Sequence, residues 1–141
     1  MSAPRLLAVI PARGGSRGLP GKNVRPLMGL PLIAHSIRLA KMCPEVTRAI
    51  ASTDCEEIAS VAREHGAEVP FLRPPELARA DTPMWPVLRH ALSEVERAEA
   101  ARYDLLLLLD PTSPTRLPED VRQALALLAE GGNDGVVAGC R

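Results

Sequence analysis

The chemistry that the sequence suggests most directly lies in a glycine-rich, basic stretch near its start. Residues 11–23 read PARGGSRGLPGKN and contain four glycines together with the cations Arg13, Arg17 and Lys22. Glycine leaves backbone N–H groups uncovered, and such groups form hollows that bind anions. This stretch, called the glycine-rich loop below, is therefore predicted to bind a polyphosphate. The alternative is a solvated basic loop with turn glycines.

Two common phosphate-binding motifs do not occur in this loop. A Walker A motif has a glycine five residues before its Gly-Lys pair, where this chain has Ser16. It also has Ser or Thr after the lysine, where this chain has Asn23. The dinucleotide fingerprint Gly-x-Gly-x-x-Gly is missing as well. The loop is therefore expected to hold phosphates in a different way.

The elements that must position this loop alternate along the chain. Strands are predicted at 6–10, 48–52, 68–72, 105–109 and 135–138, and helices near 32–42, 55–66, 82–95 and 118–131. This alternation predicts an α/β fold with a parallel sheet and helices on both faces. The run Leu105–Leu109 shows no alternation of polar and apolar residues, which predicts a central strand covered on both faces.

Polar segments follow several of the predicted strands. In an open α/β sheet, functional groups gather beyond the carboxyl ends of the strands. The glycine-rich loop, the turn 52–54, the segment from Arg73 and the stretch 110–116 are therefore expected on one rim. Thr53 and Glu56 have the spacing of a helix capping box. The two prolines that follow Arg73 predict a loop there.

Residues 10–23, IPARGGSRGLPGKN, resemble the opening signature of the acylneuraminate cytidylyltransferases, also called CMP-N-acetylneuraminic acid (CMP-sialic acid) synthetases. Three further stretches are similar to that family in order and spacing: Ser52-Thr53-Asp54, Val69–Pro74 followed by Asp81, and Asp110–Arg116. The resemblance covers essentially the whole chain and corresponds to the N-terminal two-thirds of the family pattern. It implies a three-layer α/β/α fold of the nucleotide-diphospho-sugar transferase-like (Rossmann-like) type.

The activity that the resemblance implies is transfer of CMP from CTP to the anomeric hydroxyl of a nonulosonic (sialic-type) acid, which gives a CMP-sugar and pyrophosphate. Lys22 and Arg13 are implied to be catalytic, because negative charge gathers on the phosphoryl oxygens and the departing pyrophosphate. Asp110 and Thr112 are implied to bind the sugar. The residues implied to bind the nucleotide are Ala12, Arg13, Gly14, Gly15, Ser16, Lys22, Asn23 and Arg73.

The chain departs from the family pattern at Asp110, where the family's leucine-rich strand commonly ends in Gln. An ionised carboxylate accepts hydrogen bonds but donates none, so sugar recognition should differ. Alternatively, Asp110 helps to hold Mg²⁺, the divalent cation expected as cofactor, and no other metal ligand is predicted in this chain. A third interpretation is structural, since an aspartate before a proline is a common turn former.

Two other polar residues also have structural interpretations. Arg73 could be a loop residue paired with Glu76 instead of a nucleotide contact. Asp54 stands at a predicted helix N-terminus, which is sufficient to explain an aspartate, so it is not predicted to belong to the site.

Two alternative functions remain open at this stage. One is a cytidylyltransferase for 3-deoxy-manno-octulosonic acid (Kdo) or another sugar acid, and the other is a catalytically silent nucleotide-binding domain. Family members are longer, and their acidic metal ligands and much of their dimer contact follow the part that matches here. The chain is therefore expected to be one nucleotidyltransferase domain, residues 1–141, truncated at its C-terminal end. It would be either a fragment or a natural short form of uncertain activity. The full-length family is expected to form homodimers.

The composition argues against several other classes of protein. The chain has 17 basic and 17 acidic residues, so its formal net charge is zero and no overall field attracts nucleic acid or an anionic membrane. One Trp, one Tyr and one Phe are too few for a single-strand-binding platform. The odd number of cysteines, 3, and the lack of a long apolar run predict a reduced, cytoplasmic protein without a membrane segment.

Overall fold

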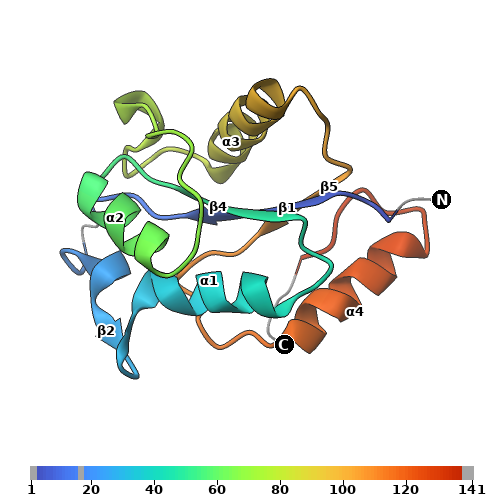
Figure 1. Cartoon of the computed structure of the whole chain (residues 1–141), viewed down its shortest axis with the longest axis horizontal. Coiled ribbons are helices and arrows are strands. Elements are labelled where there is room, and N and C mark those ends of the chain that lie inside the picture. The colour runs from blue at the N-terminus through green and yellow to red at the C-terminus, as the bar shows by residue number, and fades with distance from the viewer. Residues whose placement is uncertain (1–2, 16–17, 138–141) are drawn as a thin grey trace.

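The computed structural model describes residues 3–15 and 18–137 (Figure 1). Its main sheet has three parallel strands in the order β4-β1-β5, with β1 at Leu6–Pro11, β4 at Arg48–Ser52 and β5 at Leu105–Leu108. In the register of this sheet, Ala8 lies between Ala49 of β4 and Leu107 of β5. All six residues of β1 are buried, as an unbroken apolar run at the centre of a sheet requires.

Four α-helices cover the two faces of this sheet. They are α1 (Leu32–Met42), α2 (Glu56–Glu64), α3 (Met84–Glu99) and α4 (Pro118–Ala129). Figure 1 shows α3 on one side of the sheet and α1 and α4 on the other. The predicted three-layer α/β/α class is therefore confirmed, and the predicted bounds of α1 agree with the structure.

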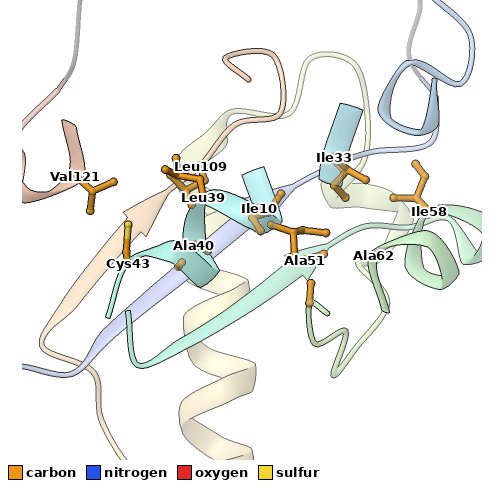
Figure 2. Packing of buried hydrophobic residues seen from close by; sticks show 14 residues of the cluster. Ile10, Ile33, Leu39, Ala40, Cys43, Ala51, Ile58, Ala62, Leu109 and Val121 are labelled. Atoms are coloured by element: carbon orange, nitrogen blue, oxygen red, sulfur yellow. The ribbon is translucent and has the colours of Figure 1, made fainter. Parts of the chain in front are cut away.

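The side chains of β1 alternate between two hydrophobic clusters. Leu7 and Val9 pack with the buried face of α3, which includes Ala91 and Val95. On the opposite face, Ala8 and Ile10 belong to the larger cluster shown in Figure 2. That cluster gathers buried residues of α1, α2 and α4, including Ile33, Ile37, Ile58, Ala62 and Val121. Burial of aliphatic side chains on both faces fixes the position of β1, and with it the start of the glycine-rich loop.

The prediction that Leu105–Leu109 forms a central strand was wrong. β5 ends at Leu108 and pairs only with β1 in the part of the chain that the structure describes. Three of its leucines are half-buried and Leu108 is exposed. Leu105, at the start of β5, contributes to an apolar groove of about 550 Å³ next to α4, which is lined also by Leu125 and Leu128. A run of leucines fits the edge of a sheet next to a helix as well as its centre.

Two further predicted strands do not form. In place of a strand at 68–72 there is a single parallel bridge between Ile50 and Glu68. Pro70 has no N–H to extend the ladder, and the Val69 carbonyl accepts a bond from Arg63 instead. Residues 135–137 of the predicted last strand form no strand, and its Ala138 lies outside the described residues.

The capping box predicted from Thr53 and Glu56 is also absent. Helix α2 starts at Glu56 after an N-cap at Cys55, so the Glu56 side chain stands two positions before the third helical residue that a capping box uses. The Thr53 hydroxyl instead accepts a hydrogen bond from the Cys55 amide at 3.1 Å. Helix α4 does have such a contact, because Asp120 Oδ2 accepts a bond of 2.8 Å from the Leu117 amide.

Short elements that the sequence did not predict surround the rim. A 3₁₀ turn, η1, spans Lys22–Val24, and a small antiparallel pair joins β2 (Pro26–Leu27) to β3 (Leu30–Pro31). A second 3₁₀ turn, η2, covers Pro75–Leu77, where a loop was predicted. These turns lead the chain into and out of the polar segments that follow the strands.

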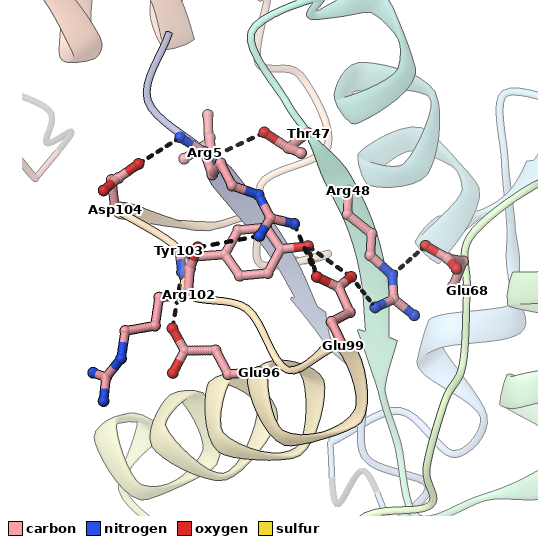
Figure 3. A network of polar contacts seen from close by, with 10 residues as sticks. Arg5, Thr47, Arg48, Glu68, Glu96, Glu99, Arg102, Tyr103 and Asp104 are labelled. Atoms are coloured by element: carbon pink, nitrogen blue, oxygen red, sulfur yellow. Dashed lines mark hydrogen bonds and ion pairs between the residues drawn. The ribbon is translucent and has the colours of Figure 1, made fainter. Parts of the chain in front are cut away.

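A polar network fastens the opposite end of the sheet, where the strands begin (Figure 3). Glu99 at the end of α3 accepts hydrogen bonds from Arg5 at 2.9 Å, from Arg48 at 2.5 Å and from the Tyr103 hydroxyl at 2.9 Å. Arg48 also donates to Glu68 at 2.5 Å. Burial opposes ionisation of Glu99, but these three donors outweigh it and keep its pKa below the ordinary value.

Across the described residues, none of the helices combines the length and the apolar content that a membrane crossing needs.

Candidate active site

Three segments that lie far apart in the sequence line one pocket at the carboxyl ends of the strands. This inner pocket has a volume of about 160 Å³. Six of the predicted site residues line it: Arg13, Lys22, Asn23, Arg73, Asp110 and Thr112. The other lining residues are Pro11, Arg79, Ala80, Thr82, Met84 and Val87. The rim inferred from strand direction therefore exists, although the six residues' contacts with substrate remain predictions.

The glycine-rich loop is held by two side chains that reach its backbone. Asn23 is buried, with 5% of its surface exposed, and its side-chain amide donates to the Arg13 carbonyl at 3.1 Å. Asp54 Oδ1 accepts a hydrogen bond from the Gly14 amide at 2.8 Å. The Arg13 guanidinium bends back to donate to the Gly15 carbonyl at 2.5 Å. The bonds from Asn23 and to Asp54 hold the two sides of the peptide group between Arg13 and Gly14, and so fix the backbone at Arg13.

A close approach between the loop and the start of α2 requires glycine at position 14. A Cβ atom built on Gly14 would lie 2.9 Å from the Cys55 Cβ, which is closer than real Cβ contacts allow. The same approach brings Gly14 to Asp54. The sequence analysis missed Asp54, because a helix N-terminus accounted for it, although its place directly after a strand was an available signal.

The predicted backbone donors do not all face the pocket. The Ala12 amide bonds to the Ser52 carbonyl at 2.9 Å, and its side chain is buried. The Gly14 amide is occupied by Asp54. Gly15 is exposed and lines a larger, open hollow of about 740 Å³, the outer pocket. Ser16, also predicted to bind the nucleotide, lies outside the described residues, as does Arg17.

Arg73 is almost fully buried and joins three parts of the rim. Its guanidinium donates to the Ser52 carbonyl at 2.6 Å, to the Ser52 hydroxyl at 3.1 Å and to the Leu77 carbonyl at 3.2 Å. The alternative pairing with Glu76 is not formed. Burial lowers the pKa of Arg73 while the Asp54 carboxylate raises it, and nearby Arg13 lowers it again. An arginine stays protonated at neutral pH despite such a shift, so a buried positive charge faces the inner pocket.

Asp110 both forms a turn and lines the inner pocket. Its Oδ1 accepts hydrogen bonds from the Thr112 amide at 3.0 Å and from the Thr112 hydroxyl at 2.8 Å. The carboxylate thus closes the turn that follows β5. It also lines the inner pocket, where, among the described residues, it is the single carboxylate beside four cations. The pocket as a whole therefore favours an anionic ligand.

The family model that matches this chain is described as cytidylyltransferase and spans residues 7–138. The chain belongs to the cytidylyltransferase family. It is 44% identical over 123 residues to a CMP-N,N'-diacetyllegionaminic acid synthase of Legionella pneumophila, covering 87% of this chain and 53% of that protein. It is 36% identical over 123 residues to an N-acylneuraminate cytidylyltransferase of Escherichia coli, covering 87% of this chain and 28% of the relative.

A solved structure shares the fold of this cytidylyltransferase domain. It is a CMP:2-keto-3-deoxy-manno-octonic acid synthetase complexed with CTP, with a TM-score of 0.68 and 22% sequence identity. The match covers 89% of this chain and 48% of that one. The chain thus spans about half the length of the Legionella relative and of this structure.

Proposed function

We propose that this domain binds CTP and takes part in the transfer of CMP to a nonulosonic acid, with release of pyrophosphate. The observation that supports this best is the inner pocket, where Arg13 and Lys22 of the glycine-rich loop and Arg73 of a separate segment line a site suited to anions. The Legionella and Escherichia relatives are named for nonulosonic acids, which supports that class of sugar acid over others.

The reaction would be a displacement at the α-phosphorus of CTP. The anomeric hydroxyl oxygen of the sugar acid forms a bond to this phosphorus, the bond to pyrophosphate breaks, and the hydroxyl proton passes to solvent. Negative charge then increases on the leaving pyrophosphate. Lys22 and Arg13 would stabilise this charge, because cations already in place need no reorganisation during the reaction.

The wall of the inner pocket that carries Asp110 and Thr112 would receive the sugar. Asp110 and Thr112 lie there, and the ionised Asp110 carboxylate can only accept hydrogen bonds. It would therefore favour sugar hydroxyl or amide groups that donate. Its Oδ1 is already engaged by Thr112, so Oδ2 is the oxygen available for this contact.

Mg²⁺ belongs to this proposal as the cofactor. No group of three or more metal-binding side chains occurs within residues 3–15 and 18–137. Mg²⁺ nevertheless often binds through one or two carboxylates together with substrate phosphates and water. Asp110 fits that pattern, and the bound ion would neutralise part of the phosphate charge. A cytoplasmic location, predicted from the cysteines and the lack of a long apolar run, and a homodimer, implied by the resemblance, remain predictions.

The test is pyrophosphate release with CTP and Mg²⁺ over a panel of legionaminic, pseudaminic, N-acetylneuraminic and Kdo acids. We expect release with at least one nonulosonic acid and little with Kdo, and equilibrium binding of CTP is measured in parallel. Release with Kdo alone would mean that the sugar substrate is a Kdo-type acid and not a nonulosonic acid. Binding of CTP without turnover would indicate a silent nucleotide-binding domain, and no binding of CTP would overturn the proposal.

A further inference from the structure

Arg79, which the sequence analysis did not assign to the site, lines both pockets of the rim. The inner pocket and the outer pocket share three lining residues: Arg13, Ala80 and Arg79. Gly15 of the glycine-rich loop lies on the outer pocket as well. The two arginines therefore stand where one pocket continues into the other.

The sizes of the pockets indicate how a nucleotide would be divided between them. Sites for small organic ligands usually measure about 300–1,000 Å³. The inner pocket, at about 160 Å³, is too small to enclose a nucleoside triphosphate. It has apolar walls from Met84 and Val87, whereas the outer pocket has few apolar side chains and is open to solvent. Because the inner pocket cannot enclose the whole ligand, the well-hydrated outer phosphates fit the open outer pocket that continues from it.

The turn that holds Arg79 is fixed, while its guanidinium is available. The Arg79 amide donates to the Thr82 hydroxyl at 3.1 Å, and the Thr82 amide donates to the Arg79 carbonyl at 3.1 Å. The Arg73 guanidinium anchors the preceding turn at Leu77. In the described part of the chain, the Arg79 side chain makes no hydrogen bond or ion pair, unlike Arg73.

We propose that Arg79 binds the β- and γ-phosphates of the nucleotide, acting with Arg13 as the second arm of a phosphate clamp. This inference rests on the proposed function. A guanidinium can bind phosphate oxygens through two parallel hydrogen bonds. Asp81 also lines the outer pocket and repels phosphate, but the two guanidinium groups outnumber it. The charge of Arg79 would thus favour nucleotides that carry the two outer phosphates.

The loss of affinity caused by removing Arg79 is expected to depend on the number of phosphates in the ligand. Equilibrium binding of CTP, CMP and inorganic tripolyphosphate is compared for the unaltered chain, Arg79→Ala and Arg79→Lys. We expect Arg79→Ala to weaken binding of CTP and tripolyphosphate by about tenfold or more, and of CMP by less than about threefold. Arg79→Lys should recover part of the loss, since it keeps the charge without the planar fork.

Arg38→Ala is the matched control, because Arg38 is an exposed arginine on α1 that lines neither pocket. It removes the same charge and should leave all three affinities unchanged. Thermal unfolding checks that every variant is folded. Unchanged CTP binding in Arg79→Ala, or an equal loss for CMP and CTP, would overturn the inference while leaving the proposed function intact.

The tripolyphosphate measurement separates the two proposals. If the unaltered chain binds tripolyphosphate but not CTP, the proposed function fails, and the loss of tripolyphosphate binding in Arg79→Ala still decides the role of Arg79. If the unaltered chain binds none of the three probes, both proposals are wrong.

Discussion

The Gly14 amide and the Asp54 carboxylate, 40 positions apart in the sequence, are joined by a hydrogen bond of 2.8 Å. Asp54 follows directly after β4 and Gly14 follows β1, so this bond connects the carboxyl ends of two adjacent strands. The Arg13 backbone lies just before this bond and is held from the other side by Asn23. The position of Arg13 in the pocket thus depends on contacts from more than one segment of the chain.

Replacing Gly14 with alanine should disturb this connection. The new Cβ would meet the Cys55 Cβ at 2.9 Å, so the loop or the start of α2 has to shift. We expect Gly14→Ala to destabilise the fold by about 1–3 kcal/mol, as overpacking does, and to weaken CTP binding. Gly18→Ala is the control, since a Cβ there meets nothing within 4 Å. Urea unfolding measures the stability, and equal midpoints for the two variants would contradict the prediction.

Lys22 should contribute directly to binding of the triphosphate. We expect Lys22→Ala to weaken CTP binding by about 1.5–3 kcal/mol, the range for a lost charge-assisted hydrogen bond. The chain has one other lysine, Lys41, which lies at the end of α1 away from both pockets of the rim. Lys41→Ala therefore removes the same side chain at a different place, and this variant should bind CTP normally. Isothermal titration of both variants makes the comparison, and equal affinities would remove Lys22 from the site.

Asp110→Gln distinguishes three roles for this carboxylate. If Asp110 contacts the sugar acid, the variant should change the preference among nonulosonic acids and leave the CTP affinity nearly constant. If it holds Mg²⁺, the variant should raise the Mg²⁺ requirement with every sugar acid alike. Pyrophosphate release, measured over sugar and Mg²⁺ concentrations, separates these outcomes. If the variant has the same sugar preference and the same Mg²⁺ requirement as the unaltered chain, the role of Asp110 is limited to the turn with Thr112.

The network around Glu99 should make stability depend on pH. Because the pKa of Glu99 is lowered in the folded state, its contribution is present above the unfolded pKa of about 4.3 and is lost as the pH falls through the folded value. We expect Glu99→Gln to cost about 1–2 kcal/mol at pH 7, after allowance for partial exposure. The difference should be smaller at pH 3 than at pH 7, because the stabilising charge of Glu99 is lost as its carboxyl becomes protonated. Urea unfolding at the two pH values checks this, and a constant difference would contradict it.

The pattern of apolar residues predicted most of this fold, and the errors have identifiable physical causes. Leu32–Met42 and Arg48–Ser52 agree with the structure because amphipathic spacing and a short apolar run between polar residues are local signals. The leucine run was placed at the centre of the sheet because hydrophobicity alone does not specify how many neighbours a strand has. Position 70 is a proline, which the prediction of a strand at 68–72 did not weigh.

Most of the candidate site, like most of the fold, could be predicted from the sequence. Strand direction placed the polar segments on one rim, and the resemblance selected residues within them. Asp54 and Arg79 were missed because their roles depend on tertiary contacts. Asp54 reaches a glycine in another segment, and Arg79 meets Arg13 of the glycine-rich loop only where the two pockets join.

The open side of β5 has a consequence for handling the protein in solution. In the described part of the chain, one side of this strand has no partner strand, and Leu108 on it is exposed. Unpaired strand edges readily template pairing with a second molecule. The formal net charge is zero at pH 7, so no long-range repulsion keeps molecules apart. Reversible self-association should therefore limit the usable concentration, and a charged residue at Leu108 should raise it.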